Sequence, residues 1–338
     1  MKKIVIIGGG VAGLCALNRL LDLGISATLI EAGSYPSHKI CGEFFSPEAL
    51  PILAAWDLEP TTKIEKISLI SDKSRLSFSL PSPAGSQSRF DFDQRLVDRA
   101  EKMGGTIITK TKVQDICTES IILENGTSMP YSELIVSSGR LFGASPHMEY
   151  IGFKGHFKGI ENLNGLEMFM FTGGYAGLSP IDHAQANFAC LLRLNHFDKD
   201  KWLLQLFEQV PLLRDRLQTG ELLFNEWLSC QVPNFGIKKN PIRPHTYFVG
   251  DAAGVIPPAS GLGLSLAISS GWLAAEYAAC GDYTGFSEAW KKKYRKIFAY
   301  GHCLHKLFMA PKILPMAMML GRLFPKLPRI IFSKTRRL

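Results

Sequence analysis

The sequence predicts an α/β fold in which a discontinuous domain with a parallel sheet is interrupted by an inserted domain with a mixed sheet. A fully apolar run, Ile4-Val5-Ile6-Ile7, leads directly into a glycine-rich loop and a helical segment, which is the order of a βαβ unit. A second short apolar strand with a glycine-rich loop occurs at 247–263. Residues 150–240 between them contain the apolar runs of a separate sheet. The first domain is therefore expected to be assembled from distant segments.

The expected elements follow this organisation in chain order. The strand at 4–7 is followed by a helix at 14–21, which Gly24 ends, and by a strand at 27–30. Next come an irregular loop with a short helix at 33–51, strands at 66–80, a loop at 82–88, a helix at 92–103, and strands at 106–113, 121–123 and 134–136. The last expected elements are strands at 168–171 and 188–192, a helix at 200–218 interrupted at Pro211, a strand at 247–249 and a helix at 262–279.

This order divides the chain into three parts. The predicted parts are a nucleotide-binding domain at 1–65, 89–145 and 241–300, a substrate domain at 66–88 and 146–240, and a basic, apolar helical tail at 301–338. From Gly301 onward there are eight cations and no acid, which equals the formal net charge of +8. The tail is expected either to lie on a membrane surface through its mixed apolar and basic residues or to cap the substrate domain.

Composition excludes several other classes of protein. Hydrophobic residues make up 46% of the chain and charged residues 20%, which indicates a globular protein. No basic groove with interleaved aromatic residues accompanies the positive charge, so a nucleic-acid partner is not expected. The uncharged stretch 252–275 contains Pro257 and Pro258 and is expected to be a buried helix rather than a membrane span. Seven cysteines without metal-ligand spacing, and no secretion signal, indicate reduced thiols, no metal site and a cytoplasmic location.

The first glycine-rich loop matches a dinucleotide-binding motif. Gly8, Gly10 and Gly13 have the G-x-G-x-x-G spacing, and Glu31 ends the next strand. Gly8 would allow a tight turn, Gly10 a close approach to a pyrophosphate, and Gly13 close packing of helix on strand. The helix N-terminus offers free N–H groups to the phosphates. Glu31 would accept hydrogen bonds from the ribose hydroxyls, and its charge disfavours a 2′-phosphate.

The second glycine-rich loop distinguishes between the two common dinucleotides. Gly250-Asp251-Ala252-Ala253-Gly254 is followed by Gly261-Leu262-Gly263-Leu264. Asp251 would bind a polyol, and the glycines let a backbone lie against a flat ring. A helix that starts near 262 would point its positive end at the ring, which stabilises an anionic reduced flavin. The two loops together predict FAD.

With these motifs the chain resembles the flavoprotein family that contains geranylgeranyl reductases, group A monooxygenases and flavin-dependent halogenases, and it is most similar to the geranylgeranyl reductase-like members. Lys39-Ile40-Cys41-Gly42 resembles their loop beside the flavin. Arg89, with Phe92-Asp93 after it, resembles a helix start whose arginine contacts FAD, and Val113 falls at an adenine contact. The predicted cofactor-binding residues are Gly8, Gly10, Ala12, Gly13, Glu31, Cys41, Gly42, Arg89, Val113, Asp251, Gly263 and Leu264.

The chain also departs from this family. Ser137-Ser138-Gly139-Arg140 stands where the monooxygenases have an Asp-Gly pair linked to NADPH and FAD. Gly177 replaces the second aromatic residue of the Tyr-x-Trp-x-Phe-Pro motif of the reductases, which would enlarge a pocket wall. The catalytic residue stays open. Its candidates are Cys41, Tyr175 and His183, with the alternatives of a buried filler, a core tyrosine and an exposed loop histidine.

The resemblance implies an FAD-dependent oxidoreductase that acts on a hydrophobic molecule such as a lipid, isoprenoid or polyketide. Reduction of a C=C bond or dehydrogenation, by hydride transfer at flavin N5, is favoured over hydroxylation by a monooxygenase. A non-catalytic binder of prenylated proteins is a third alternative, although the intact loop at 250–264 argues against it. There is no second G-x-G-x-x-G motif, so the electron donor, NAD(P)H or a redox protein, is external. Cytoplasmic location with peripheral attachment to a membrane through 301–338 is also expected.

Overall fold

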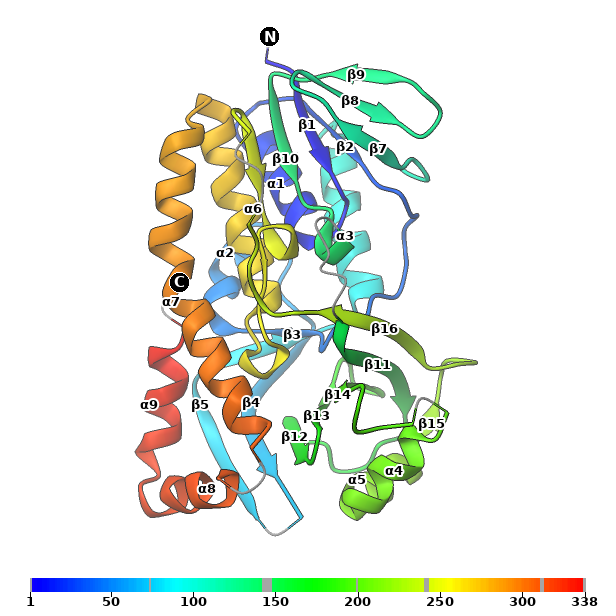
Figure 1. The fold of residues 1–338 in the computed structure, drawn as a ribbon, viewed down its shortest axis with the longest axis vertical. Coiled ribbons are helices and arrows are strands. Elements are labelled where there is room, and N and C mark those ends of the chain that lie inside the picture. The colour runs from blue at the N-terminus through cyan, green and yellow to red at the C-terminus, as the bar shows by residue number, and fades with distance from the viewer. Residues whose placement is uncertain are drawn as a thin grey trace.

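The computed structural model describes residues 2–72, 74–141, 148–198, 200–239, 243–310 and 313–336. Two main sheets organise them (Figure 1), one of five strands and one of nine. The predicted α/β fold, with a parallel nucleotide-binding sheet and a separate mixed sheet, is confirmed. The domain boundaries predicted at 145 and 241, and the tail cations Lys312 and Arg337, lie outside the described residues.

The five-stranded sheet has the order β18-β10-β1-β2-β6, and all its neighbouring strands are parallel. Its strands are β1 (Ile4–Ile7), β2 (Ala27–Ile30), β6 (Thr106–Ile108), β10 (Glu133–Val136) and β18 (Thr246–Phe248). β1 and β10, which are neighbours near the middle, are buried throughout. This burial on both faces explains why these strands are continuous apolar runs in the sequence.

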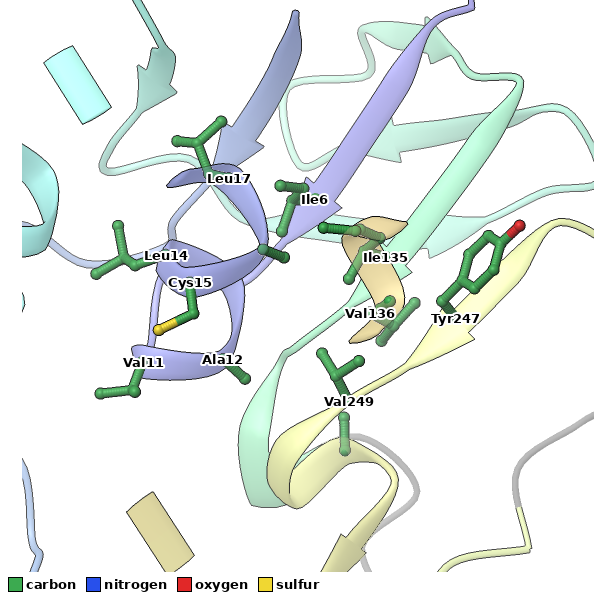
Figure 2. Close-up of a cluster of buried hydrophobic side chains, with 14 of the residues drawn as sticks. Ile6, Val11, Ala12, Leu14, Cys15, Leu17, Ile135, Val136, Tyr247 and Val249 are labelled. Carbon is green, nitrogen blue, oxygen red and sulfur yellow. The ribbon is translucent and has the colours of Figure 1, made fainter. Parts of the chain in front are cut away.

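Three helices pack around this sheet. α1 (Val11–Asp22) lies against α6 (Gly263–Cys280) and against α3 (Arg89–Lys102). Figure 2 shows Leu14 and Cys15 of α1 in one cluster with Ile6, Ile135 and Tyr247 of the strands. α6 is largely buried, which confirms the helix expected at 262–279. The stretch 252–275, expected to be a buried helix, is α-helical only from Gly263 onward. Across the part of the chain that the structure describes, no helix combines the length and the apolar character needed to cross a membrane.

The nine-stranded sheet has the order β15-β11-β14-β13-β12-β4-β5-β3, and β16 also pairs with β11. Its strands are β3 (Phe44–Phe45), β4 (Thr62–Ile70), β5 (Arg75–Ser86), β11 (Met148–Lys158), β12 (Leu166–Phe171), β13 (Gly174–Pro180), β14 (Gln185–Arg193), β15 (Glu221–Leu222) and β16 (Leu228–Pro233). β4 and β12 pair in parallel. That pairing joins the part of the mixed sheet that precedes β6 and β10 in the sequence to the part that follows them.

Two strand predictions are wrong in their extent. The loop expected at 82–88 is mostly strand, because β3 and β4 supply hydrogen-bond partners to β5 as far as Ser86. The strand expected at 106–113 is divided between two sheets. The chain turns at Lys110, whose φ is +52°, and β7 (Val113–Ile116) then begins a small sheet with β8 (Ser120–Leu123) and β9 (Ser128–Pro130).

The remaining helices are α2 (Leu50–Ala54), α4 (Trp202–Gln209), α5 (Pro211–Gln218), α7 (Tyr283–Phe308), α8 (Leu314–Leu323) and α9 (Lys326–Lys334). Of these, α2 and most of α7 pack into the core of the parallel-sheet domain, and the others lie beside the mixed sheet. The interruption predicted at Pro211 separates α4 from α5. The boundary predicted at 301 falls inside α7, and the boundary at 65 falls inside β4. α8 and α9 pack against β5 at the lower left of Figure 1, so the tail caps the mixed sheet.

Candidate cofactor and substrate site

Three glycines of the loop between β1 and α1 are crowded, Gly9 by the Tyr35 hydroxyl and the other two mainly by backbone atoms. Gly8 has φ +93°, and a Cβ added to it would lie 2.5 Å from the Ser137 carbonyl oxygen. A Cβ added to Gly13 would lie 2.0 Å from the Gly8 carbonyl oxygen and 2.4 Å from Ser137 Oγ. Both positions therefore require glycine, one for a left-handed turn and one for close packing of helix on strand.

Other glycines of the two loops and of the loop at 39–42 are open instead of crowded. A Cβ added to Gly10, Gly42 or Gly263 would have no heavy atom within 4 Å among the described residues. Beside Gly8, the buried Ser138 Oγ has no hydrogen-bond partner in the described part of the chain. Open backbone and an unsatisfied buried hydroxyl are what a site for a flat ring and a pyrophosphate requires. The residues present therefore fit FAD.

Glu31 holds the glycine loop in place. Its Oε2 accepts a hydrogen bond of 2.6 Å from the Gly9 N–H, and its Oε1 accepts one of 2.9 Å from the Gly33 N–H. The Tyr35 hydroxyl donates to the Gly9 carbonyl oxygen at 2.5 Å. Each carboxylate oxygen can accept more than one hydrogen bond, so these two contacts leave Glu31 able to accept from ribose hydroxyls. The contact of Glu31 with a ribose stays a prediction.

On the flavin side, Asp251 lies in the short helix η3 (Gly250–Ala252), which follows β18. Its Oδ2 is 3.5 Å from Nε of Arg140, and Arg140 Nη2 donates to the Ile40 carbonyl oxygen at 3.1 Å. Burial raises the pKa of Asp251, although Arg140 and Lys238 oppose the rise. Arg140 thus joins three segments of the site, in the stretch where the sequence departs from the monooxygenases.

Three further residues that were predicted to bind FAD lie in three different elements. Ala12 is buried in α1, and the Cβ position of Gly250 lies 3.0 Å from its Cβ. Leu264 is buried in the first turn of α6. Val113 begins β7, in the small sheet beside the parallel one. Their contacts with FAD stay predictions.

Arg89 is buried at the N-terminus of α3 and is not an ordinary surface arginine. Its Nε and Nη2 donate to the two carboxylate oxygens of Asp93 at 2.5 and 2.6 Å. Burial opposes the charge of Arg89, but Asp93 raises its pKa further, so the guanidinium stays protonated. Its charge is therefore already balanced by Asp93, and the expected contact with FAD stays a prediction.

A buried ionic cluster that was not predicted from the sequence lies under the loop at 39–43. The Glu43 carboxylate accepts hydrogen bonds of 2.5 Å from Lys154 Nζ, 2.8 Å from His156 Nε2 and 2.7 Å from the Arg89 N–H. Burial raises the pKa of Glu43, but His156 and Lys154 outweigh it and lower the pKa overall. Lys154 Nζ also donates to the Lys39 carbonyl oxygen at 3.0 Å. The cluster fixes the loop of Cys41 and Gly42 to β11. Lys154 and His156 alternate on that strand, but no sequence signal connects them with Glu43.

Of the catalytic candidates, Cys41 and His183 have few interactions. Cys41 is half-buried, and its Sγ accepts a hydrogen bond of 3.3 Å from the Glu43 N–H. His183 is exposed in the turn after β13, as its alternative interpretation expected. Neither is brought to another candidate group by a hydrogen bond among those described.

Tyr175 lies in a buried chain of polar groups. Its hydroxyl oxygen is 3.3 Å from His305 Nδ1 and accepts a hydrogen bond of 3.0 Å from the Ala259 N–H. His305 Nε2 lies 3.2 Å from the Tyr150 hydroxyl. Burial raises the pKa of Tyr175 and lowers that of His305 to about 4. His305 lies 130 residues from Tyr175 and was not predicted from the sequence to be part of the site.

Around this chain is an apolar layer between the mixed sheet and helices α7 and α8. Its buried apolar members besides the two tyrosines are Leu76, Met170, Leu191, Val232, Ala259, Phe308, Leu314 and Met318. The enlargement expected at Gly177 is partly filled, because the Met168 sulfur lies 3.3 Å from the position of an added Cβ. Methionines adapt to irregular apolar shapes. The layer therefore surrounds a few polar groups with apolar and adaptable side chains.

Comparison with known proteins gives relatives along most of the chain. No protein-family model matches it. It is 25% identical over 353 residues to a protein named menaquinone reductase from Mycolicibacterium smegmatis, which covers 92% of this chain and 85% of that protein. It is 24% identical to the mitochondrial electron transfer flavoprotein-ubiquinone oxidoreductase of Oryza sativa subsp. japonica, over 81% of this chain and 59% of that protein.

Solved structures share the fold. A flavin-dependent brominase, Bmp2, has a TM-score of 0.81 at 18% identity and covers 98% of this chain and 93% of its own. A geranylgeranyl bacteriochlorophyll reductase-like protein from Thermoplasma acidophilum has a TM-score of 0.75 at 16% identity and covers 98% of both chains. The predicted fold resemblance to these flavoproteins is confirmed. The chain is an FAD-dependent oxidoreductase, as the two glycine loops indicated.

Proposed function

We propose that this oxidoreductase reduces a carbon–carbon double bond of a hydrophobic, quinone-like or isoprenoid-like substrate. The relatives named menaquinone reductase support this substrate class over most of the chain. The apolar layer beside the flavin half-site supports it independently, because a hydrophobic ligand site is lined mainly by apolar and aromatic side chains with few polar groups.

The observation that carries the proposal is the Tyr150–His305–Tyr175 chain inside that layer. Tyr175 receives the Ala259 N–H, and Ala259 lies in the short helix η4 (Pro258–Ser260), between Asp251 and Gly263. A hydroxyl at this position faces the part of the chain assigned to the flavin. It offers a proton in otherwise apolar surroundings, which is what addition across an apolar double bond requires.

Reduced FAD, when bound, supplies a hydride to one carbon of the double bond. We assign the proton for the other carbon to the Tyr175 hydroxyl. With a hydrogen on Nδ1, His305 donates to the Tyr175 oxygen, as the Ala259 N–H does, so the hydroxyl hydrogen is free to point at substrate. These two donors stabilise the tyrosinate left after transfer. Tyr150 donates to His305 Nε2, so transfer of the Nδ1 proton to Tyr175 and of the Tyr150 proton to Nε2 would restore Tyr175. Tyr150 would then take a proton from the solvent.

The electrons for this reaction come from an external donor, NAD(P)H or a redox protein, because the chain contains a single G-x-G-x-x-G motif. We place the enzyme in the cytoplasm, attached peripherally to the membrane in which hydrophobic quinones and isoprenoids are dissolved. The exposed side of α8 and α9 supports this placement.

Three variants test the role of Tyr175 and His305. We expect Tyr175→Phe and His305→Gln to retain bound FAD, measured by absorbance, and to reduce a menaquinone-type substrate about 100-fold more slowly, as for loss of a general acid. The matched control is His302→Gln, one turn earlier on α7, whose ring nitrogens lie 2.8 and 3.2 Å from the Phe298 and Phe235 carbonyl oxygens. Equal rates in His305→Gln and His302→Gln would contradict the assignment.

Hydroxylation by a group A monooxygenase is the competing reaction. Rapid mixing of the reduced enzyme with O2 and substrate separates the two, with product mass as the readout. Without O2, we expect the substrate to gain two hydrogen atoms. With O2 present, we expect the product to contain no added oxygen atom. A product that gains one oxygen atom would replace the reductase proposal.

A further inference from the structure

The exposed side of α8 and α9 is unusually apolar. Nine large apolar residues between 313 and 331 are at least 36% exposed, more than in the whole of the rest of the described chain. We call them the tail face: Ile313, Met316, Met319, Leu320, Leu323, Phe324, Leu327, Ile330 and Ile331. A soluble monomer rarely exposes such a continuous group of apolar side chains unless it binds something there.

The tail face follows from helical periodicity. In α8 the exposed Met316, Leu320 and Leu323 recur at helical spacing, and Leu314 and Met318 are buried on the other side. A helix that covers a protein core normally turns charged or polar residues to the solvent. α8 is instead apolar on both sides, so its outer side is not explained by packing within the chain.

The charged residues of the tail itself are all of one sign, although Arg75 at its border lies 3.5 Å from Glu167. Arg322, Lys326, Arg329 and Lys334 are exposed, and Glu288 is the last acidic residue of the sequence. A second copy of this face would bring like charges together, which disfavours self-association. Anionic lipid headgroups are complementary to both the cations and the apolar residues.

A basic groove borders the tail face. It has a volume of about 410 Å³ between β5 and helices α8 and α9. Arg75, Arg322 and Arg329 line it together with apolar side chains that include Leu76 and Phe78. Arg322 Nε donates to the Arg75 carbonyl oxygen at 3.0 Å, which holds α8 to the strand. The groove has the size and charge for a phosphate headgroup with the start of its acyl chains.

The helices are fixed to the rest of the protein, so the tail face is presented rigidly. Phe332 is buried beside β5. The buried Arg336 guanidinium donates to Ser46 Oγ at 3.0 Å and to the Ser260 carbonyl oxygen. Burial lowers the pKa of Arg336 to about 10, which leaves it charged near pH 7. The tail thus caps the mixed sheet with one side and leaves the other for a partner.

We propose that the tail face and the basic groove bind the surface of an anionic lipid bilayer, with lipid phosphates in the groove and the apolar residues in the interfacial region. The inference stands on this surface alone and is independent of the reaction proposed above. The two expectations for the tail, that it caps the substrate domain and that it lies on a membrane surface, are then compatible. One side of α8 and α9 packs on the mixed sheet, and the opposite side faces the bilayer.

Co-sedimentation of the full-length FAD-loaded protein with vesicles tests the proposal. We expect binding to vesicles of phosphatidylglycerol with phosphatidylcholine, and at least about tenfold weaker binding to phosphatidylcholine alone. Leu323→Asp should weaken binding about tenfold. Its control is Leu204→Asp on α4, because both leucines are 65% exposed. Arg329→Glu should weaken binding several-fold, whereas Lys292→Glu on the exposed side of α7 should not.

Several outcomes would overturn the proposal. They are no binding to anionic vesicles, equal binding of both vesicle types, or equal effects of Leu323→Asp and Leu204→Asp. Light scattering that shows a dimer dissociated by Leu323→Asp would assign the face to a second copy instead. Flavin absorbance of each variant verifies that the protein is folded, and the rate with a short-chain, water-soluble substrate separates failure of the bilayer site from failure of the proposed reaction.

Discussion

The geometry of one half of the site is set by the backbone, and the geometry of the other half is set by side-chain contacts. In the half around β1, α1 and α6, backbone shape decides, because glycines are either crowded, as at Gly13, or open, as at Gly10 and Gly263. In the half around the mixed sheet, side chains decide, because Glu43, Tyr175 and their partners meet through hydrogen bonds and ion pairs. The first half is therefore sensitive to added atoms and the second to removed polar groups.

The difference shows how function can vary on this fold. A backbone cradle accepts one type of ligand, because its shape is set by turns and by close packing of a helix on a strand. Polar side chains in an apolar layer can be exchanged individually while the fold is kept. The reaction is thus expected to depend on the mixed-sheet half, where Gly177 also marks a departure from related flavoproteins.

The largest expected effect is in the mixed-sheet half. Glu43→Ala leaves the charges of Lys154 and His156 buried without their partner, so the free energy of unfolding should fall by about 3–5 kcal/mol. Chemical denaturation measures it. The control is Glu149→Ala, since Glu149 is half exposed and 3.7 Å from Arg193, and it should change stability by less than about 0.5 kcal/mol. Similar losses in the two variants would show that the cluster does not stabilise the loop.

A pair of glycine variants tests the cradle half. Gly13→Ala places a methyl group against the Gly8 carbonyl oxygen and should lower the free energy of unfolding by about 2–3 kcal/mol. Gly10→Ala meets open space and should leave the stability of the FAD-free protein within about 0.5 kcal/mol. Its methyl group points into the cradle, so FAD affinity should fall at least about tenfold, measured by titration. Unchanged FAD affinity in Gly10→Ala would show that the pyrophosphate does not bind at this position.

The smallest expected effect concerns pH. Burial lowers the pKa of His305 from its usual 6.5 to about 4 in the folded state. Between these pH values the unfolded chain binds the extra proton, so the free energy of unfolding falls as pH is lowered from about 6.5 to 4. In His305→Gln this loss should be smaller by about 1–2 kcal/mol. Parallel pH profiles of wild type and variant, by denaturation at each pH, would show that His305 is not buried as described.

The sequence alone determined much of the parallel-sheet half. Continuous apolar strands, the spacing of Gly8, Gly10 and Gly13, and the loop at 250–264 are local features, and each is fixed by backbone geometry within a few residues. Hence the α/β fold, the FAD-dependent class and the buried helix at 262–279 could be predicted. The errors at 82–88 and 106–113 arose where pairing with distant strands, or a turn at a non-glycine residue, decided the local structure.

The tertiary structure alone decided which polar groups meet in the mixed-sheet half and how the tail packs. Glu43 and Lys154 are 111 residues apart, Tyr175 and His305 are 130 apart, and Ser46 and Arg336 are 290 apart. The sequence separation between such partners matches no local motif, because their contact depends on how sheets and helices pack. For the same reason the sequence could describe the tail as basic and apolar, but packing on β5 decided which apolar residues are buried and which form the exposed tail face.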